Sequence, residues 1–142
     1  MSDALGRRVI FHGAVVVLLG LAAGFPFAFV ILGTMAGDQR AWRMAHLEGV
    51  LNGVVMFAVT AVSGRLVLSG GLQTLLAWCL VVTGYGNVVA SILAASLGVR
   101  GLEAGGSVGN TVVYVLFVVA VVTITVAMAL LAFGARRSVT EK

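Results

Sequence analysis

The residues of this chain with the clearest chemical potential are a histidine and two asparagines in long apolar stretches. His46 and Asn52 lie six positions apart, and Asn87 lies in a later stretch. A neutral imidazole is a common metal ligand, and an amide both donates and accepts hydrogen bonds. Polar groups inside a membrane are costly and usually serve a function. The three residues therefore indicate a candidate metal or cofactor site, provided that the surrounding elements bring them to one depth.

Composition defines these elements. The 142 residues are 61% hydrophobic and only 10% charged, and the mean hydropathy is +1.13. Residues 9–35, 44–66, 72–97 and 108–133 are apolar, and each stretch exceeds the roughly 20 residues that a helix needs to cross the hydrocarbon. We predict an all-α fold, a single integral membrane domain over residues 1–142 with four transmembrane helices. Glycine pairs at 70–71 and 105–106 predict tight turns between the spans.

The basic residues predict how this domain is oriented. Six lie on one side of the predicted spans and three on the other: Arg7, Arg8, Arg65, Arg136, Arg137 and Lys142 against Arg40, Arg43 and Arg100. The positive-inside rule then places both termini in the cytoplasm. Basic residues at helix ends bind anionic lipid headgroups, which accounts for the net charge of +4. The sequence contains no nucleic-acid motif, so the expected surroundings are the lipid bilayer.

Small residues share the face of the second span that carries His46. At 100° per residue, Gly53 lies within about 20° of His46 and Gly49 about 60° away, so the histidine stands over a strip without side chains. A planar macrocycle would fit on such a strip. This makes His46 a candidate metal ligand and Gly49 and Gly53 candidate cofactor contacts, with plain contact between helices as the alternative.

Two other polar residues of this span are expected on different sides. Asn52 projects from the flank of the strip, about 9 Å deeper than His46 along the helix. Glu48 is expected to point to the opposite side, where Arg40 or Arg43 would be its partner near the surface. Asn52, rather than Glu48, is therefore predicted to belong to the site.

The third span carries a polar stripe at helical spacing. Thr83, Asn87 and Ser91 recur every four residues, and in antiparallel helices Asn87 and Ser91 come to the depth of His46, as does Tyr114 of the fourth span. One pocket is therefore expected to hold these groups. For the two hydroxyl side chains the alternative is a bond to the carbonyl of their own previous helical turn.

The second histidine is expected to be separate from this pocket. His12 is predicted near the cytoplasmic end of the first span and His46 near the outer end of the second, separated by something approaching the roughly 30 Å of hydrocarbon. The two imidazoles then cannot bind one haem within one chain. A structural or interfacial role is predicted for His12.

Three stretches of the chain resemble the styrene oxide isomerases, which are small bacterial membrane proteins with four spans. The most specific match is residues 42–53, with the pattern W-x-x-A-H-x-x-x-x-x-N-G. The second match is residues 84–88 (GYGNV) with 100–102 (RGL), and a weaker third is residues 12–13 (HG). The matches span the helices in order.

The resemblance implies a cofactor, an assembly and a reaction. Family members are homotrimers in the bacterial inner membrane that hold haem b between neighbouring subunits, and the residue matching His46 is the axial iron ligand. Their ferric iron acts as a Lewis acid on an epoxide oxygen, and an aryl epoxide such as styrene oxide rearranges to an aldehyde. The residue matching Asn52 belongs to the substrate side, where we also place Asn87 and Tyr114 as catalytic candidates.

Two departures from the family pattern keep other functions open. Family members have an aspartate where this chain has Thr83 and a tyrosine where it has Ser91; Tyr85 and, better placed, Tyr114 are candidate substitutes. The first hypothesis is a haem-dependent isomerase of apolar or aryl epoxides. The alternative is a membrane haem protein that senses gas or redox state or carries electrons without isomerising anything. A third reading is a haem-free membrane protein that only assembles with itself.

Overall fold

The computed structural model describes residues 1–136, and they fold into four long helices. These are α1 (Asp3–Ile31), α2 (Gln39–Val62), α3 (Gly70–Leu97) and α4 (Val108–Arg136), with one short 3-10 turn, η1 (Ser63–Arg65), after α2. Each of the four is long and apolar enough to cross a membrane, and residues 1–136 contain no strand. The predicted all-α fold with four membrane-spanning helices is confirmed.

The helix boundaries follow capping residues more closely than hydropathy. Ser2 caps α1 and accepts a hydrogen bond from the Leu5 amide, so the helix begins at Asp3 rather than at residue 9. The Asp38 carboxylate caps α2 and accepts from the amides of Arg40 and Ala41 at 2.7 and 3.1 Å. As a result α2 begins at Gln39, earlier than the apolar run, and His46 lies two turns inside the helix.

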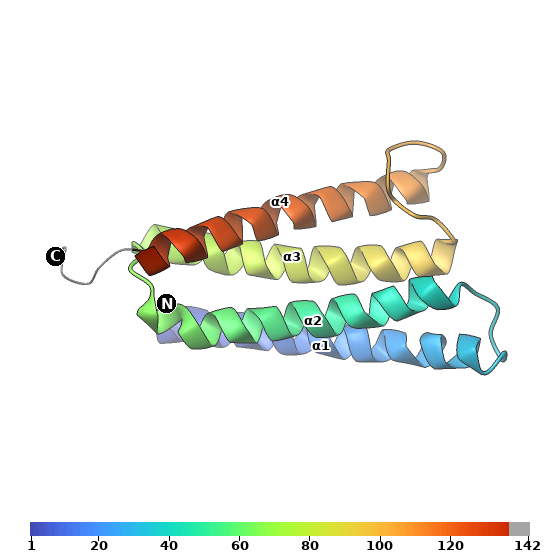
Figure 1. The fold of residues 1–142 in the computed structure, drawn as a ribbon, viewed down its shortest axis with the longest axis horizontal. Coiled ribbons are helices and arrows are strands. Elements are labelled where there is room, and N and C mark those ends of the chain that lie inside the picture. Colours follow the sequence, from blue (N-terminus) through green and yellow to red (C-terminus); the bar gives the residue numbers. More distant parts are fainter. Residues whose placement is uncertain (137–142) are drawn as a thin grey trace.

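The helices form two antiparallel hairpins, α1–α2 and α3–α4, and the first hairpin packs against α3 of the second. Figure 1 shows α1 beside α2 and α4 beside α3. In the most apolar stretch of α3, 61% of the residues are buried inside the chain, against 11% in α4. Helix α3 is therefore the central element, and α4 packs chiefly against it.

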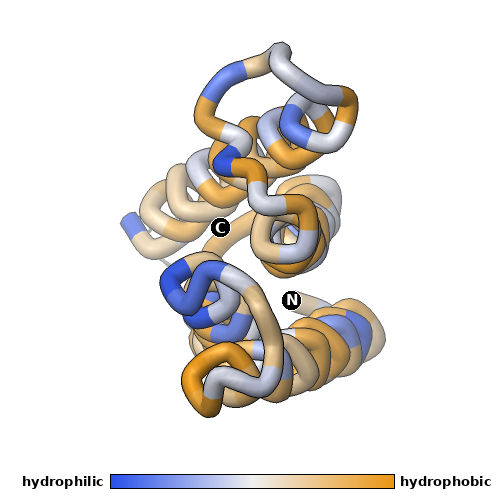
Figure 2. The backbone as a smooth tube through the Cα atoms, turned by 90° about the vertical axis from the view of Figure 1, so that its right-hand side faces the viewer, coloured by the Kyte–Doolittle hydropathy of each residue, from blue (hydrophilic) through white to orange (hydrophobic). Residues whose placement is uncertain are grey.

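The two ends of the domain carry different connections. Figure 1 places the N-terminus, the α2–α3 connection and the end of α4 at one end, and the α1–α2 and α3–α4 loops at the other. Hydrophilic segments concentrate in these loops and at helix ends (Figure 2). Which end faces the cytoplasm stays a prediction. Two of the basic residues behind it, Arg137 and Lys142, lie outside the described residues.

The two predicted glycine turns have different outcomes. Gly105 and Gly106 lie in the α3–α4 loop with φ of 115° and 74°, a region that side chains disfavour, which confirms a turn there. Gly70 and Gly71 instead form the first turn of α3, so the prediction of a tight turn at this pair is wrong. The chain instead reverses its direction through η1 and through residues 66–69, which precede α3.

Candidate functional site

His46 is held by a backbone carbonyl of the neighbouring helix. Its Nδ1 lies 2.9 Å from the Gly20 carbonyl oxygen of α1, and its ring lies against Gly24, where a Cβ atom would come within 3.0 Å of Nδ1. A carbonyl oxygen only accepts hydrogen bonds, so Nδ1 carries a proton, and in the neutral imidazole Nε2 then keeps its lone pair. This is the arrangement in which proteins orient a histidine that binds metal. The half-buried imidazole therefore has one nitrogen fixed and the other available for a ligand.

The glycine strip next to His46 is filled by α1. A Cβ atom at Gly49 would lie 2.3 Å from the Gly20 Cα, and one at Gly53 would lie 2.7 Å from the Gly13 carbonyl oxygen. This is the helix-contact alternative, and no macrocycle can lie on this strip within one chain. The glycines let α1 approach closely enough for His46 to reach the Gly20 carbonyl. Direct contact of Gly49 and Gly53 with a cofactor stays a prediction.

Asn52 and Asn87 meet between α2 and α3, as their depths predict. The Asn87 Nδ2 donates to the Asn52 Oδ1 at 3.2 Å. The Asn52 Nδ2 donates to the Glu48 backbone oxygen at 2.7 Å and to the Glu48 Oε2 at 2.8 Å. Glu48 therefore does not point away toward a surface arginine, and that expectation is wrong. Residues four apart lie only about 40° apart on a helix, a relation that was visible in the sequence.

The predicted polar stripe of α3 divides among three environments. The buried Thr83 hydroxyl donates to the Ala120 carbonyl of α4 at 3.3 Å and lies 2.8 Å from the Thr123 hydroxyl, so the alternative of a bond to its own helix does not hold for Thr83. Asn87 faces α2, one turn further along. Ser91 is buried and lines a cavity. Thr83 therefore contributes to the α3–α4 contact rather than to a pocket.

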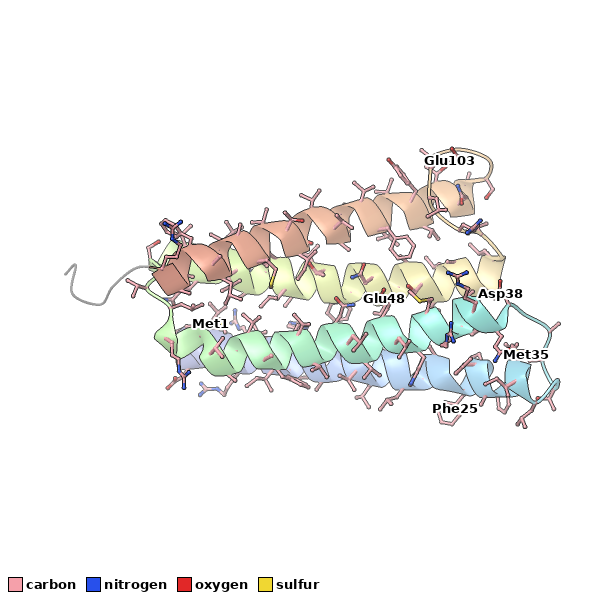
Figure 3. The ribbon with its side chains drawn as sticks, viewed as in Figure 1. Met1, Phe25, Met35, Asp38, Glu48 and Glu103 are labelled. Atoms are coloured by element: carbon pink, nitrogen blue, oxygen red, sulfur yellow. The ribbon has the colours of Figure 1, made fainter. Side chains whose placement is uncertain are left out.

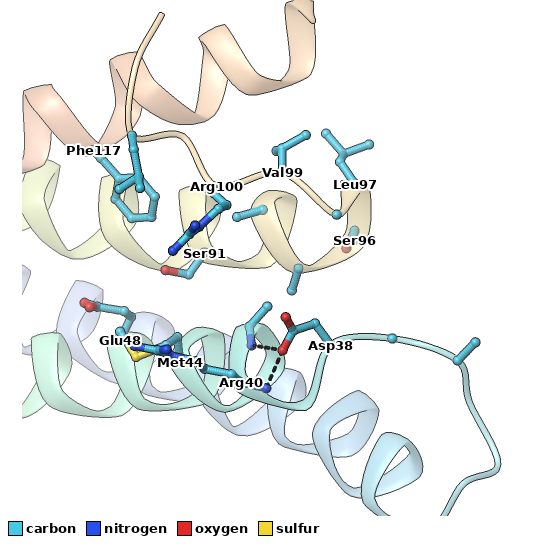
Figure 4. A pocket seen from close by; sticks show the side chains of 17 residues that line it. Asp38, Arg40, Met44, Glu48, Ser91, Ser96, Leu97, Val99, Arg100 and Phe117 are labelled. Atoms are coloured by element: carbon cyan, nitrogen blue, oxygen red, sulfur yellow. Dashed lines mark hydrogen bonds between the residues drawn. The ribbon is translucent and has the colours of Figure 1, made fainter. Parts of the chain in front are cut away.

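This cavity is the main candidate for a substrate pocket. Its volume is about 900 Å³, and it lies between the two hairpins at the end with the α1–α2 and α3–α4 loops. Figure 4 shows Glu48 and Ser91 entering it from opposite helices, with Phe117 of α4 beside them and Arg100 reaching in from the loop. Figure 3 shows Glu48 well inside the domain, whereas Asp38 and Glu103 lie at its end. The Glu48–Asn52–Asn87 cluster thus borders the pocket through Glu48.

None of the six predicted site residues lines this pocket. Gly49 and Gly53 pack against α1, and Asn52 and Asn87 are linked to the pocket only through Glu48. His46 contacts α1 and is not among the residues that line the cavity. Tyr114 of α4 is half-buried, does not line it either, and its hydroxyl makes no hydrogen bond to the described part of the chain. The expectation that one pocket of a single chain holds His46, Tyr114 and both asparagines is therefore wrong.

The second histidine belongs to a separate contact. The His12 Nδ1 lies 3.1 Å from the Tyr85 hydroxyl, and the two rings meet edge to face with centroids 5.7 Å apart. The Tyr85 hydroxyl is therefore bonded to His12 and does not line the pocket, so Tyr85 does not replace the family tyrosine there. Because His46 lies level with Gly20 of α1, the axial offset from His12 is about 12 Å rather than the thickness of the membrane. The His12 ring faces Tyr85 of α3 and the His46 ring faces Gly20 of α1, so the two imidazoles of one chain do not turn toward a common iron.

The donors around His46 fit a cofactor that brings its own ligands. Residues 1–136 contain no group of three or more His, Cys, Asp or Glu side chains that could hold a metal ion. A metal bound at the His46 Nε2 would therefore take its other ligands from a macrocycle, and a single neutral imidazole is a normal axial ligand of haem. The histidine fits this group, provided that the macrocycle approaches from outside the strip covered by α1.

Four apolar helices with a polar cluster and a cavity between them define a multi-pass membrane protein with an internal site. Residues 5–136 match the family model described as styrene oxide isomerase, and the chain belongs to that family. It is also similar to hydroxylaminobenzene mutase HabB of Ectopseudomonas oleovorans, with 32% identity over 132 residues that cover 89% of this chain and 77% of the relative. These matches make it a membrane enzyme of the isomerase or mutase type.

Proposed function

We propose that this enzyme rearranges a small aryl substrate at a haem b site in which His46 is the axial ligand. The observation that carries this proposal is the hydrogen bond from the His46 Nδ1 to the Gly20 carbonyl, which leaves Nε2 free. A histidine inside a membrane is costly and usually serves a function, and this tautomer leaves a nitrogen that can bind a metal. When bound, the haem supplies a Lewis acid that polarises a substrate oxygen.

The chain's own residues would form the substrate side. The Asn52–Asn87 pair does not line the pocket itself but is hydrogen-bonded to Glu48, which does, so it would keep the polar side of the pocket preorganised for a substrate. Phe117 and Met44 give the pocket apolar walls that suit an aryl ring and limit water. Where these walls exclude water, they would keep it from trapping a carbocation-like species before it rearranges. For an aryl epoxide such as styrene oxide, the product is the aldehyde.

A site shared between neighbouring subunits accounts for the separation of His46 from the pocket. Within one chain the imidazole lies on the α1 side of α2, whereas Glu48 and Ser91 line the cavity on the α3 side. A neighbouring copy would have to bring its own His46 toward this pocket. We propose a closed homo-oligomer, a trimer as the family implies. If Tyr114 is catalytic, it would likewise act in the pocket of a neighbouring subunit.

The environment of the protein is proposed from the same reasoning as its orientation. We place it in a bacterial inner membrane with both termini in the cytoplasm, because basic residues are more frequent at that end. An apolar substrate would then reach the site from the lipid bilayer, in which such molecules concentrate.

A second substrate class is favoured by the relative and by two residues of this chain. The similar protein from Ectopseudomonas oleovorans is a hydroxylaminobenzene mutase. Thr83 and Ser91 replace the aspartate and tyrosine expected from the epoxide-rearranging relatives, and Thr83 is occupied by its contact with α4. We therefore propose arylhydroxylamines beside aryl epoxides as candidate substrates, with an isomeric aminophenol as product.

The test is an absorption spectrum followed by turnover assays on the same sample. Protein purified in detergent from haem-supplied cells should show a Soret band that shifts with dithionite. Without added cofactor, it should convert styrene oxide to phenylacetaldehyde or phenylhydroxylamine to an aminophenol. A Soret band without either product would favour the non-isomerising sensor or carrier. Absence of a Soret band would overturn the haem proposal.

A further inference from the structure

Glu48 is the one acidic side chain of residues 1–136 that lies in the interior of a helix. Asp3 and Asp38 lie at helix starts, and Glu103 lies in the α3–α4 loop. Glu48 lies about 15 Å further along the axis of α2 than Asp38, and it lines the 900 Å³ cavity. A carboxylate at that depth is costly unless it has partners or a task. Among the described residues, only one of its two carboxylate oxygens has a hydrogen-bond partner.

One carboxylate oxygen of Glu48 is used and the other is not. Oε2 accepts from the Asn52 Nδ2, whose second hydrogen goes to the Glu48 backbone oxygen. Both N–H groups of Asn52 are thus taken, so its Oδ1 must face the Asn87 amide. Oε1 accepts no hydrogen bond from residues 1–136. Glu48 therefore fixes the orientation of the two amides and offers one free acceptor at the inner end of the pocket.

The position of this acceptor matters for substrate choice. Arg40 and Arg100 line the same cavity from its loop end and supply donors, while Glu48 supplies a pure acceptor beside Ser91. An epoxide or ketone only accepts hydrogen bonds and would leave Oε1 without a partner. A hydroxylamine or alcohol carries N–H or O–H groups that can donate to it. Discrimination is largest where a mismatched ligand leaves a buried polar group unpaired.

We propose that Glu48 is a specificity-determining residue that selects aryl ligands with a hydrogen-bond donor. Its Oε1 accepts the N–H or O–H of the ligand, while its Oε2 holds the Asn52–Asn87 pair in place. This inference rests on the proposed function for the aryl character of the ligand and decides between its two substrate classes. The selected class is the arylhydroxylamines.

The experiment compares two unreactive probes of the same shape. Binding of 1-phenylethanol, which donates, and acetophenone, which only accepts, is measured by calorimetry on the purified full chain. Wild type should prefer the alcohol by about tenfold or more, the range expected for a hydrogen bond to a charged group. Glu48→Gln should lose this preference, because its amide can turn an N–H toward the ketone. Glu48→Asp should retain part of it.

A matched control separates the carboxylate at this position from any general effect of charge. Glu103→Gln makes the same chemical change in the exposed loop and should leave the preference unchanged. Weaker binding of both probes to Glu48→Gln in equal proportion would mean that Glu48 acts only on structure, and it would overturn the proposal. An unchanged preference in that variant, or no binding of either probe to wild type, would overturn it as well.

Turnover measured separately distinguishes this inference from the proposed function. Selective alcohol binding without turnover of either substrate would support the role of Glu48 and contradict the proposed reaction. Turnover of styrene oxide with a probe preference that Glu48→Gln leaves unchanged would support the reaction and overturn the role of Glu48. Helical content and elution volume of each variant confirm that the comparison uses folded protein.

Discussion

Among the described residues, two of the polar clusters within the apolar helices differ in which atoms remain available to a ligand. In the first, Glu48, Asn52 and Asn87 form a chain of hydrogen bonds that ends in a free carboxylate oxygen beside a cavity of about 900 Å³. In the second, His12 and Tyr85 bond each other next to a cavity of about 250 Å³. The first cluster offers a carboxylate oxygen to the larger cavity, whereas the second offers at most the His12 Nε2 to the smaller one.

This difference suggests how intramembrane polar groups divide between function and structure. A polar group in the membrane is stable when it has an internal partner, and such pairs link helices. A group that stays open toward a cavity gains a partner only when a ligand enters. We therefore expect substitutions near the open cluster and at His46 to change chemistry, and substitutions at the closed pair to change stability alone.

The largest effect is expected for His46→Ala, which removes the proposed iron ligand. The Soret band should be lost and turnover should fall by more than about a hundredfold, because a metal site depends on its direct ligand. Absorption of the purified protein measures the first effect and product formation the second. His12→Ala is the control and should keep its haem. Full haem content and full rate in His46→Ala would contradict the assignment.

A smaller effect is expected for Asn87→Leu. This change removes the donor to Asn52 and one preorganised polar group, so kcat/KM should fall by about tenfold to a hundredfold while the Soret band is unchanged. Steady-state kinetics with the better of the two substrates measures it. Thr125→Val removes a hydroxyl that bonds only its own helix and should leave kcat/KM unaltered. An equal loss of kcat/KM in Asn87→Leu and Thr125→Val would contradict the view that polar groups near the cavity matter more for turnover than those bonded within one helix.

Gly49→Ala should act on stability through the α1–α2 contact. The new methyl group would lie 2.3 Å from the Gly20 Cα, so the helices must separate at a cost of about 1–3 kcal/mol. Thermal unfolding in detergent should show a lower Tm, together with weaker haem retention because His46 loses its carbonyl partner. Gly71→Ala meets no atom within 4 Å and should not lower the Tm. An unchanged Tm for Gly49→Ala would contradict the close approach.

The smallest effect is expected for Tyr85→Phe, which opens the closed pair. Loss of one hydrogen bond to His12 should cost about 1 kcal/mol of stability and leave the Soret band and kcat/KM unchanged. Denaturant titration measures the first quantity. A large loss of turnover in this variant would show that the closed pair takes part in the reaction.

The sequence predicted the elements well because each signal was local. Apolar stretches fixed the four helices, and helical spacing placed Asn52 and Asn87 at one depth. The partner of His46 was not predictable, since a backbone carbonyl has no signature in residue types. The contact of Thr83 with α4 and the filling of the Gly49 strip depend on which helices are neighbours, and a single sequence does not specify that.

The most direct test asks whether the histidine of one subunit serves the pocket of another. His46→Ala and Asn87→Leu subunits are purified separately and then co-assembled in equal amounts, and turnover is compared with that of each variant alone. In a randomly mixed ring, about a quarter of the interfaces would combine an intact His46 with an intact pocket. Recovery of about a quarter of the wild-type rate is the predicted result. Activity no higher than the average of the two variants would contradict a site shared between subunits.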